Sequence, residues 1–437
     1  MRGPPGAAAV AMVIAMAACT GTTGTVKLDL TTAPGSRVLD AVDQLRLTIT
    51  NPHQVIEARR TAAGFDLALD LDASGVTGAL IIEGFDAGGA LVACGQSPRF
   101  PIAAINAHIV VYMAAPRSIG LAPVTLDAPR SEVSGSALEY GAVLAGGRDP
   151  GGAPSAAILI YNAYDHARAI GAAMPAPRAG VAVGTGSGGG VYLFGGAGPD
   201  GNPTGTLWRF DTTVPPSGVY ITLPVAAGFA RADQLMVPVG PERFLITGAP
   251  PLALELGTVT ARTDLPALPA AGATAIAADG TPAAIFAGAE LVRYRQGTFD
   301  TLRAGGRTNA TAATLPDGRV VVIGGGEPAP SRDALVIDGA TGAVTVIPGA
   351  LATARSRPSL AATSRYLVIA GGTDPDGAPV ATAEVLDAHT LAPITTLPIL
   401  ARTGAFAVAL PTEQVLLAGG TPATAALELF TPEPPPP

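Results

Sequence analysis

The chain has 437 residues, of which 55 are glycine and 41 are proline, and it carries a formal net charge of −8. Charged residues make up 14% and apolar residues 48%, which excludes a disordered chain because enough apolar surface exists to be buried. The glycine and proline content excludes a helical bundle, and the lack of a basic run gives no electrostatic reason to expect nucleic-acid binding. A large all-β protein of short strands and many turns remains.

The N-terminus has the organisation of a signal peptide. Arg2 supplies a positive charge, and the apolar run 7–18 is too short to span a bilayer, which takes about 20 residues. The run ends in Met16-Ala17-Ala18-Cys19, which resembles the lipobox of bacterial lipoproteins. This resemblance implies that residues 1–18 are removed, that Cys19 is acylated, and that residues 19–25 form a tether. The alternative is a plain secretory signal with an incidental cysteine.

The lipobox resemblance implies a lipid-anchored protein of the bacterial cell envelope. Thr20 is not an acidic retention signal, which favours the outer membrane, with either a periplasmic or an external orientation. Cys94 is the second of only two cysteines, so acylation of Cys19 leaves it unpaired. Its place in an alternating, strand-like run predicts a buried and inert thiol.

Residues 26–116 are expected to form a small antiparallel β-sandwich of immunoglobulin-like shape. Apolar residues alternate with polar ones in short segments that turn sequences separate, the pattern of half-buried strands. No Cys…Trp…Cys spacing is present, so the likeness concerns shape alone, and nothing in this region predicts catalysis. The expected strands are 25–31, 45–49, 65–71, 78–87, 91–94 and 108–114.

From about residue 119 the chain repeats. Seven times an apolar strand ends in a small-residue doublet, five times as Gly-Gly, and an arginine precedes six of these doublets by 16 or 17 residues. The fourth repeat has Ala271 in place of the arginine. The doublet strands are 143–147, 192–196, 244–248, 284–288, 321–325, 367–372 and 415–420. The arginines are Arg130, Arg178, Arg231, Arg307, Arg355 and Arg402.

A third marker follows each doublet, namely an apolar strand with an aromatic or acidic end, as in 158–162 and 383–387. Together the markers resemble the kelch family of β-propellers, whose repeats combine a Pro-Arg start, a Gly-Gly turn, and strands that carry Tyr and Trp. Only Tyr161 and Trp208 reproduce these aromatics. The resemblance implies a propeller over residues 119–431, with seven blades, or six if the weak fourth unit belongs to the third.

The last repeat stops after its third strand, and the proline-rich tail 432–437 cannot continue a sheet. The segment 118–130 matches the stretch that precedes the other arginines. We therefore expect 118–130 to supply the missing outer strand and close the ring without an open edge.

The repeated arginines are expected near one mouth of the propeller channel, beside the loops that follow the doublets. Such a site suits an anionic or carbohydrate ligand, because arginine offers forked donors and aspartate accepts hydroxyls. In the alternative each arginine pairs with carbonyls or a carboxylate and fixes the ring, since a residue that repeats with the blade is usually architectural. The candidate ligand-binding residues are Arg178, Arg231, Arg307, Arg355, Arg402, Asp200, Asp374 and Asp376.

We predict no catalytic residue, metal site or cofactor. Asp374 and Asp376 lie in turn sequences without EF-hand spacing, and the four histidines are dispersed. The glycine-rich segment 184–190 lacks the ending of a phosphate-binding loop and is expected between two strands.

The predicted function is that of a membrane-anchored lipoprotein whose propeller is a non-enzymatic module for binding a protein or glycan of the envelope. A sugar-modifying enzyme similar to the sialate mutarotases, acting in the channel, is one alternative. A structural envelope component is the other. Sugar chemistry needs two carboxylates about 5–10 Å apart in the channel, which separates the enzyme from the binding module.

Overall fold

A computed structural model of the chain describes residues 26–61, 64–65, 76–101, 107–277, 279–304, 307–326 and 329–435. The predicted signal peptide, Cys19 and the tether lie outside these residues. The described chain is nearly all β-strand, with two short 3-10 turns, η1 (Val38–Ala41) and η2 (Ser187–Gly189). No helix in this part of the chain has the length and apolarity needed to cross a membrane.

The N-terminal region is built on a five-stranded antiparallel sheet of order β4-β3-β2-β6-β7. Strands β1 and β9 pair with each other and share a core with this sheet that includes Leu28, Leu47 and Ile109. The strands are β1 (Val26–Thr31), β2 (Gln44–Thr50), β3 (His53–Thr61), β4 (Gly64–Phe65), β5 (Thr77–Gly78), β6 (Leu80–Phe85), β7 (Leu91–Gln96), β8 (Phe100–Pro101) and β9 (Ala107–Tyr112).

Two details of this region differ from the sequence-based expectation. The β1–β9 pair is parallel, so the expectation of a purely antiparallel region is wrong. Parallel pairing is possible because the rest of the region connects the two strands, and no tight turn has to join them. Strand β3 was not expected, because Ala58 is its only buried residue and its charged side chains hide the alternation. Of the expected strand 65–71, only Phe65 is described.

Seven four-stranded antiparallel sheets make up the rest of the described chain. Sheet 1 comprises β11 (Ser134–Leu138), β12 (Gly141–Ala145), β13 (Ile158–Asn162) and β14 (Arg168–Ile170). Sheet 2 comprises β15 (Ala182–Thr185), β16 (Gly190–Phe194), β17 (Leu207–Asp211) and β18 (Val219–Leu223). Sheet 3 comprises β19 (Met236–Gly240), β20 (Arg243–Ile246), β21 (Leu252–Glu255) and β22 (Thr258–Ala261). Sheet 4 comprises β23 (Ala271–Ile276), β24 (Pro282–Ala287), β25 (Glu290–Arg295) and β26 (Thr298–Ala304).

The remaining three sheets follow the same order. Sheet 5 comprises β27 (Thr311–Thr314), β28 (Val320–Ile323), β29 (Ala334–Ile337) and β30 (Val344–Ile347). Sheet 6 comprises β31 (Ser359–Ala362), β32 (Tyr366–Ala370), β33 (Thr382–Asp387) and β34 (Pro393–Pro398). Sheet 7 comprises β35 (Phe406–Ala409), β36 (Val415–Ala418), β37 (Thr424–Thr431) and β10 (Ser118–Arg130).

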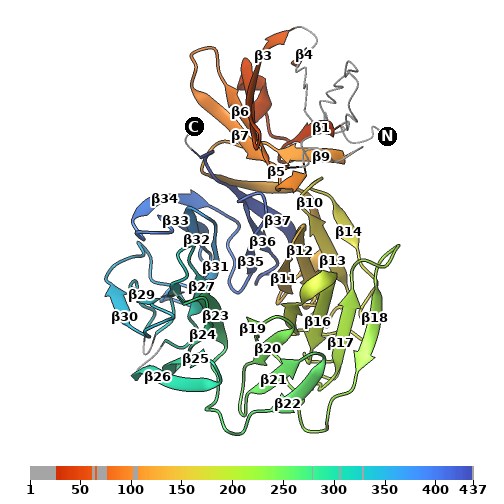
Figure 1. Cartoon of the computed structure of the whole chain (residues 1–437), viewed down its shortest axis with the longest axis vertical. Coiled ribbons are helices and arrows are strands. Elements are labelled where there is room, and N and C mark those ends of the chain that lie inside the picture. The colour runs from red at the N-terminus through yellow and green to blue at the C-terminus, as the bar shows by residue number, and fades with distance from the viewer. Residues whose placement is uncertain are drawn as a thin grey trace.

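The seven sheets surround a common centre, with the N-terminal region beside sheets 1 and 7 (Figure 1). The first strand of each sheet contacts the first strand of the next, and β35 contacts β11. Each neighbouring pair of sheets also shares a buried apolar cluster. Between sheets 1 and 2 the cluster contains Val143 and Trp208, and between sheets 7 and 1 it contains Leu416 and Leu144. This arrangement is compatible with a β-propeller.

The expected exchange of strands between the two ends of the sheet-forming chain is confirmed. Strand β10 pairs antiparallel with β37, and Ser118 and Ile119 lie opposite Thr431 and Phe430. Phe430 is fully buried, so the pairing covers an apolar edge that would otherwise be open.

The glycine doublets adopt positive φ angles. In sheet 6, Gly371 and Gly372 have φ of 61° and 96°. A Cβ on Gly371 would lie 2.3 Å from the carbonyl oxygen of Arg402, and the amide of Gly372 donates to that same oxygen at 2.9 Å. The doublet is therefore the seam where one sheet bonds to the arginine backbone of the next.

The N-terminal region docks on the opposite end of the sheets, away from the doublets. Its amide of Val110 donates to the carbonyl oxygen of Tyr164, in the turn between β13 and β14. The thiol of Cys94 donates to the carbonyl oxygen of Pro432, just beyond β37, at 3.3 Å. Cys94 is buried as expected, and burial raises the pKa of its thiol to about 12.

Candidate functional site

The repeat arginine of sheet 6 is fully buried, and its guanidinium bonds within its own sheet. Arg355 Nη1 donates to the carbonyl oxygens of Gly371 and Thr382 at 3.0 and 3.1 Å, and Nη2 donates to Glu384 Oε1 at 2.5 Å. Glu384 also accepts the backbone amides of residues 352–353. Burial lowers the pKa of Arg355, and the charge of Glu384 partly offsets this. The result is an internal clamp that joins the start of the repeat to its third strand.

Sheet 7 repeats this clamp. Arg402 donates to the carbonyl oxygen of Gly419 at 3.0 Å and forms an ion pair with Glu428, which also accepts the amide of Leu400. Sheet 1 modifies it, because Arg130 donates to the carbonyl oxygen of Gly146 and pairs with Asp127 instead of a third-strand acid.

The other arginines reach the same place with different partners. The guanidinium of Arg178 lies over the Trp208 ring, 5.1 Å from its centroid. Trp208 takes the place of the glutamate in the third strand of sheets 6 and 7. Arg307 donates to the carbonyl oxygen of Asp333. Arg231 donates to the carbonyl oxygen of Thr247 at 3.0 Å. Each predicted arginine thus stands at the doublet end of its own sheet, and these contacts fit the architectural alternative.

The predicted aspartates lie in the loops after the doublets. Asp374 accepts the amides of Asp376 and Ala378, and Asp200 accepts from Asn202, which are turn-stabilising bonds. Asp200 also has a weak electrostatic contact with Arg178. Asp376 is exposed. Among the described residues no three His, Cys, Asp or Glu side chains are placed to hold a metal ion.

A second repeating position, two residues after each arginine, was not predicted from the sequence. All six residues there have positive φ, between 48° and 63°, and we call them the left-handed ring. Backbone bonds link several of its members, for example from the Asp233 amide to the Gly180 oxygen at 2.9 Å and from the Arg357 amide to the Asn309 oxygen at 2.7 Å. The ring consists of Glu132, Gly180, Asp233, Asn309, Arg357 and Gly404. A signal was present, because Gly, Asn and Asp tolerate this conformation.

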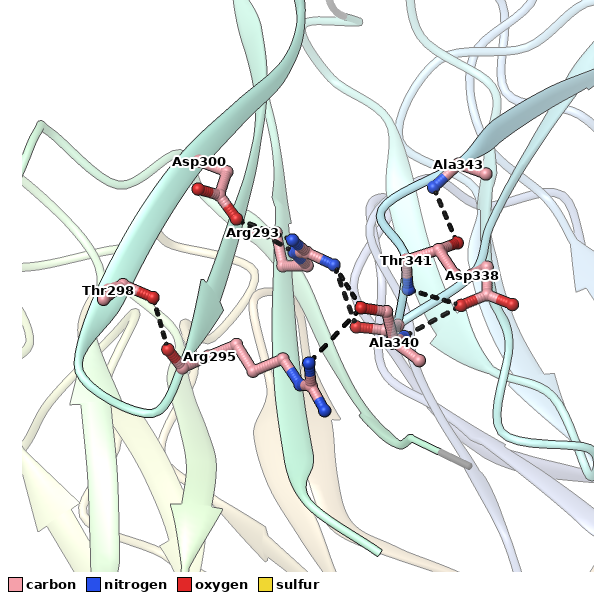
Figure 2. A network of polar contacts seen from close by, with 9 residues as sticks. Arg293, Arg295, Thr298, Asp300, Asp338, Ala340, Thr341 and Ala343 are labelled. Carbon is pink, nitrogen blue, oxygen red and sulfur yellow. Dashed lines mark hydrogen bonds and ion pairs between the residues drawn. The ribbon is translucent and has the colours of Figure 1, made fainter. Parts of the chain in front are cut away.

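Sheet 4 interrupts the left-handed ring. Leu268, and not Ala271 as the sequence predicts, stands in place of the arginine there, because its carbonyl oxygen accepts the amide of Gly248 as that of Arg402 accepts the amide of Gly372. No residue between Leu268 and β23 has a positive φ, so the described ring has no member between Asp233 and Asn309. Sheet 4 is instead joined to sheet 5 at the opposite end (Figure 2). Arg293 Nη1 donates to the carbonyl oxygen of Ala340 at 2.7 Å in the turn after β29, and its Nη2 pairs with Asp300 at 2.6 Å.

A cavity of about 620 Å³ lies inside the ring of sheets, at the interruption. It adjoins a second cavity of about 390 Å³, and Leu235, Gly272 and Phe406 line both. The lining is otherwise mostly small, with Ala, Gly, Ser and Thr. Among the described residues that line the two cavities, Arg357 is the only charged one.

Two charged ring members lie at this mouth: Arg357 lines the larger cavity, and Asp233 directly precedes Gln234 and Leu235, which line the cavities. Arg357 is exposed, and none of the hydrogen bonds or ion pairs within the described chain involves its guanidinium. Asp233 also has an exposed surface, yet nearby atoms exclude enough water to raise the pKa of its carboxyl, and Glu132 adds to the rise. The charges of Arg148 and Arg357 act in the opposite direction. Glu132 itself pairs with Arg148 at 2.7 Å.

No protein-family model matches the chain, and a search of curated proteins finds no match to its sequence.

Proposed function

We propose that the chain is a lipid-anchored bacterial envelope protein whose seven sheets form a kelch-like propeller, and that this propeller is a non-enzymatic module for binding a protein or a glycan. The observation that carries the proposal is the placement of the mouth. The left-handed ring and the cavity lie at the doublet end of the sheets, whereas the N-terminal region docks on the turns at the opposite end.

This placement suits a tethered receptor. The predicted anchor, Cys19, precedes the N-terminal region in the chain. A protein held by that region presents the far end of its sheets, and so the mouth, away from the membrane. The seven clusters shared between neighbouring sheets, and the strand exchange of β10, support the seven-bladed form of the proposal over the six-bladed one.

The composition of the cavity favours binding over sugar chemistry. Among the described lining residues there is no carboxylate, and glycosidic chemistry uses two at about 5–10 Å. A cavity of this size next to an exposed arginine also gives a receptor something to bind with, which a purely structural component does not need.

The anchor is tested by fractionating cells that express Cys19→Ala. We expect this variant in the soluble fraction and the matched variant Cys94→Ala, which removes a buried thiol, in the membrane fraction. Retention of Cys19→Ala on membranes contradicts the anchor.

The binding role is tested with the soluble Cys19→Ala chain as bait, against envelope proteins and on a glycan array. Saturable capture of one partner is the expected result. Turnover of a captured sugar supports the enzyme, and no saturable partner supports the structural component.

A further inference from the structure

We propose that the mouth cavity binds a small carboxylate, with Arg357 holding the carboxylate group and Asp233 accepting a hydroxyl or ammonium donor of the same ligand. The inference rests on the proposed binding function and names the ligand chemistry of that site.

The backbone of Arg357 supplies the first argument. Its φ is 48°, in the left-handed region that costs an L-residue about 1–2 kcal/mol. The equivalent positions in sheets 2 and 7 are Gly180 and Gly404, which adopt the same conformation without that penalty. An arginine in a position suited to glycine is a strained choice, and strain of this kind concentrates at functional sites.

The free guanidinium supplies the second argument. The repeat arginines Arg355 and Arg402 use their donors on carbonyls and acids within their sheets. Arg357 has no such partner in the described chain, and it is the one charged group on the cavity wall. A planar fork of five donors that faces a cavity without acids matches a carboxylate.

The interruption at sheet 4 supplies the third argument. In the regular ring the amide of one member donates to the carbonyl of the previous one, as from Gly404 to Arg357. Sheet 4 contributes no member, so Asn309 follows a gap in the described ring and lines the cavity beside Arg357. The cavity thus borders the break in the ring, and the side chain of Arg357 lines this cavity while its backbone stays bonded to Asn309 and Gly404.

Asp233 decides the rest of the ligand. Asp233 is exposed and directly precedes Gln234 and Leu235 of the cavity lining, and it forms no ion pair with Arg357 within 4 Å. A bare anion would be repelled by Asp233, whereas a ligand that also carries donors gains a second contact. Phe406, half-buried on the same wall, offers an aromatic face to the ligand body. Sugar acids and amino acids both have this chemistry.

The test is calorimetric titration of the purified full chain with glucuronate, glutamate and glucose. Glucose matches glucuronate except for the carboxylate. We expect saturable binding of glucuronate or glutamate, at least tenfold tighter than any binding of glucose. Preference for glucuronate identifies a sugar acid as the source of the carboxylate, and preference for glutamate an amino acid. Equal affinity for glucose and glucuronate, or no binding of any probe, overturns the proposal.

Variants assign the contacts. Arg357→Gln should weaken carboxylate binding at least tenfold, and Asp233→Asn should weaken it by a smaller factor. Arg243→Gln, at the opposite end of sheet 3, is the matched control and should leave affinity unchanged. Thermal unfolding of each variant checks that it is folded. Unchanged affinity in Arg357→Gln overturns the inference.

The two proposals fail in different ways. An envelope partner captured equally by the wild-type chain and by Arg357→Gln leaves the binding function standing and removes the carboxylate site. Failure of the wild-type chain to capture any partner or probe removes both.

Discussion

Sheets 6 and 4 have the same four-stranded form but are held by different polar contacts. Sheet 6 buries an arginine that donates to a glutamate and to two carbonyl oxygens of its own repeat. Sheet 4 has the buried Leu268 at the position of the arginine, since its carbonyl oxygen accepts the amide of Gly248, and it is joined to sheet 5 through Arg293 at the opposite end. A sheet of this fold can therefore be stabilised by a buried Arg–Glu clamp. It can also have an apolar residue at that position and hydrogen bonds to the next sheet at its opposite end.

The difference separates architecture from function. Where the repeat is kept, its polar residues are buried and their donors are used inside the protein. The cavity borders the sheet that lacks the repeat, and Arg357 of sheet 6, the one charged residue among its described lining residues, is exposed. Each prediction below changes one side of this contrast.

The largest effect is expected from Glu384→Ala. The variant leaves Arg355 buried without its carboxylate, and loss of one partner of a buried pair lowers the free energy of unfolding by roughly 3–5 kcal/mol. The double variant Arg355→Met with Glu384→Leu imitates sheet 4 and should recover most of the loss. Denaturant unfolding measures both. An Asp40→Ala control, which breaks the exposed Arg37–Asp40 pair, should unfold as the wild type does. A Glu384→Ala chain as stable as this control contradicts the clamp.

The tie of sheet 4 comes next. Arg293→Met removes charge-assisted bonds to the carbonyl oxygens of Gly339 and Ala340 and the pair with Asp300, and should destabilise the chain by about 1.5–3 kcal/mol. Hydrogen exchange should show faster opening in sheets 4 and 5 than in sheet 7. Arg243→Met, which removes an exposed arginine of sheet 3, is the control. An equal increase in the hydrogen-exchange rate over all the sheets would show that the Arg293 contacts do not stabilise sheets 4 and 5 locally.

A third prediction concerns the buried His166, in the turn of sheet 1 that meets the N-terminal region. Burial lowers the pKa of His166 to about 3, below its ordinary value of 6.5. The unfolded chain therefore takes up the proton first, so stability is complete above pH 6.5 and falls as the pH drops toward 3. Between pH 8 and pH 5 the loss is about 2 kcal/mol. His166→Asn, which suits the positive φ of 50° and does not titrate, should lack this part of the pH dependence in urea unfolding. An identical pH profile in the two chains contradicts it.

The smallest effect has the opposite sign. Arg357→Gly relieves the left-handed strain and should raise the free energy of unfolding by about 1 kcal/mol, while it abolishes carboxylate binding. Gly404→Ala, the reverse change at an equivalent ring position, should destabilise. Thermal unfolding of the two variants checks the signs. A less stable Arg357→Gly chain would show that the arginine is structural.

Much of the seven-sheet arrangement could be predicted from the sequence, because its geometry requires particular residue types at particular positions. A Gly-Gly turn is required where the carbonyl of the next arginine passes within van der Waals distance, as at Gly371, and such a requirement leaves a visible spacing. The pairing of β10 with β37 was predictable for a similar reason, since the last repeat lacks one strand. Strand β3 was not, because Ala58 is its only buried residue and its charged side chains leave no apolar alternation.

The candidate site was less predictable. The repeat arginines attracted attention because they repeat, yet the donors of Arg355 and Arg402 bond inside their own sheets. Arg357 and Asp233 share no residue type, so only their backbone conformation relates them. They come near the cavity only because the seven sheets close around it, and local sequence does not show which residues will meet there.

The pairing of β10 with β37 has a consequence for the order in which the protein can mature. Strand β10 leaves the ribosome before the other strands of the seven sheets, whereas its partner β37 is the last of these strands to be made. Until β37 is made, the apolar side chains of Ala122 and Leu126 lack their cover, and the edge of β10 is open to other strands. A chain interrupted before Thr424 keeps that edge exposed and offers it to chaperones and proteases. Sheet 7 can therefore be completed only after the other strands of the seven sheets have been made.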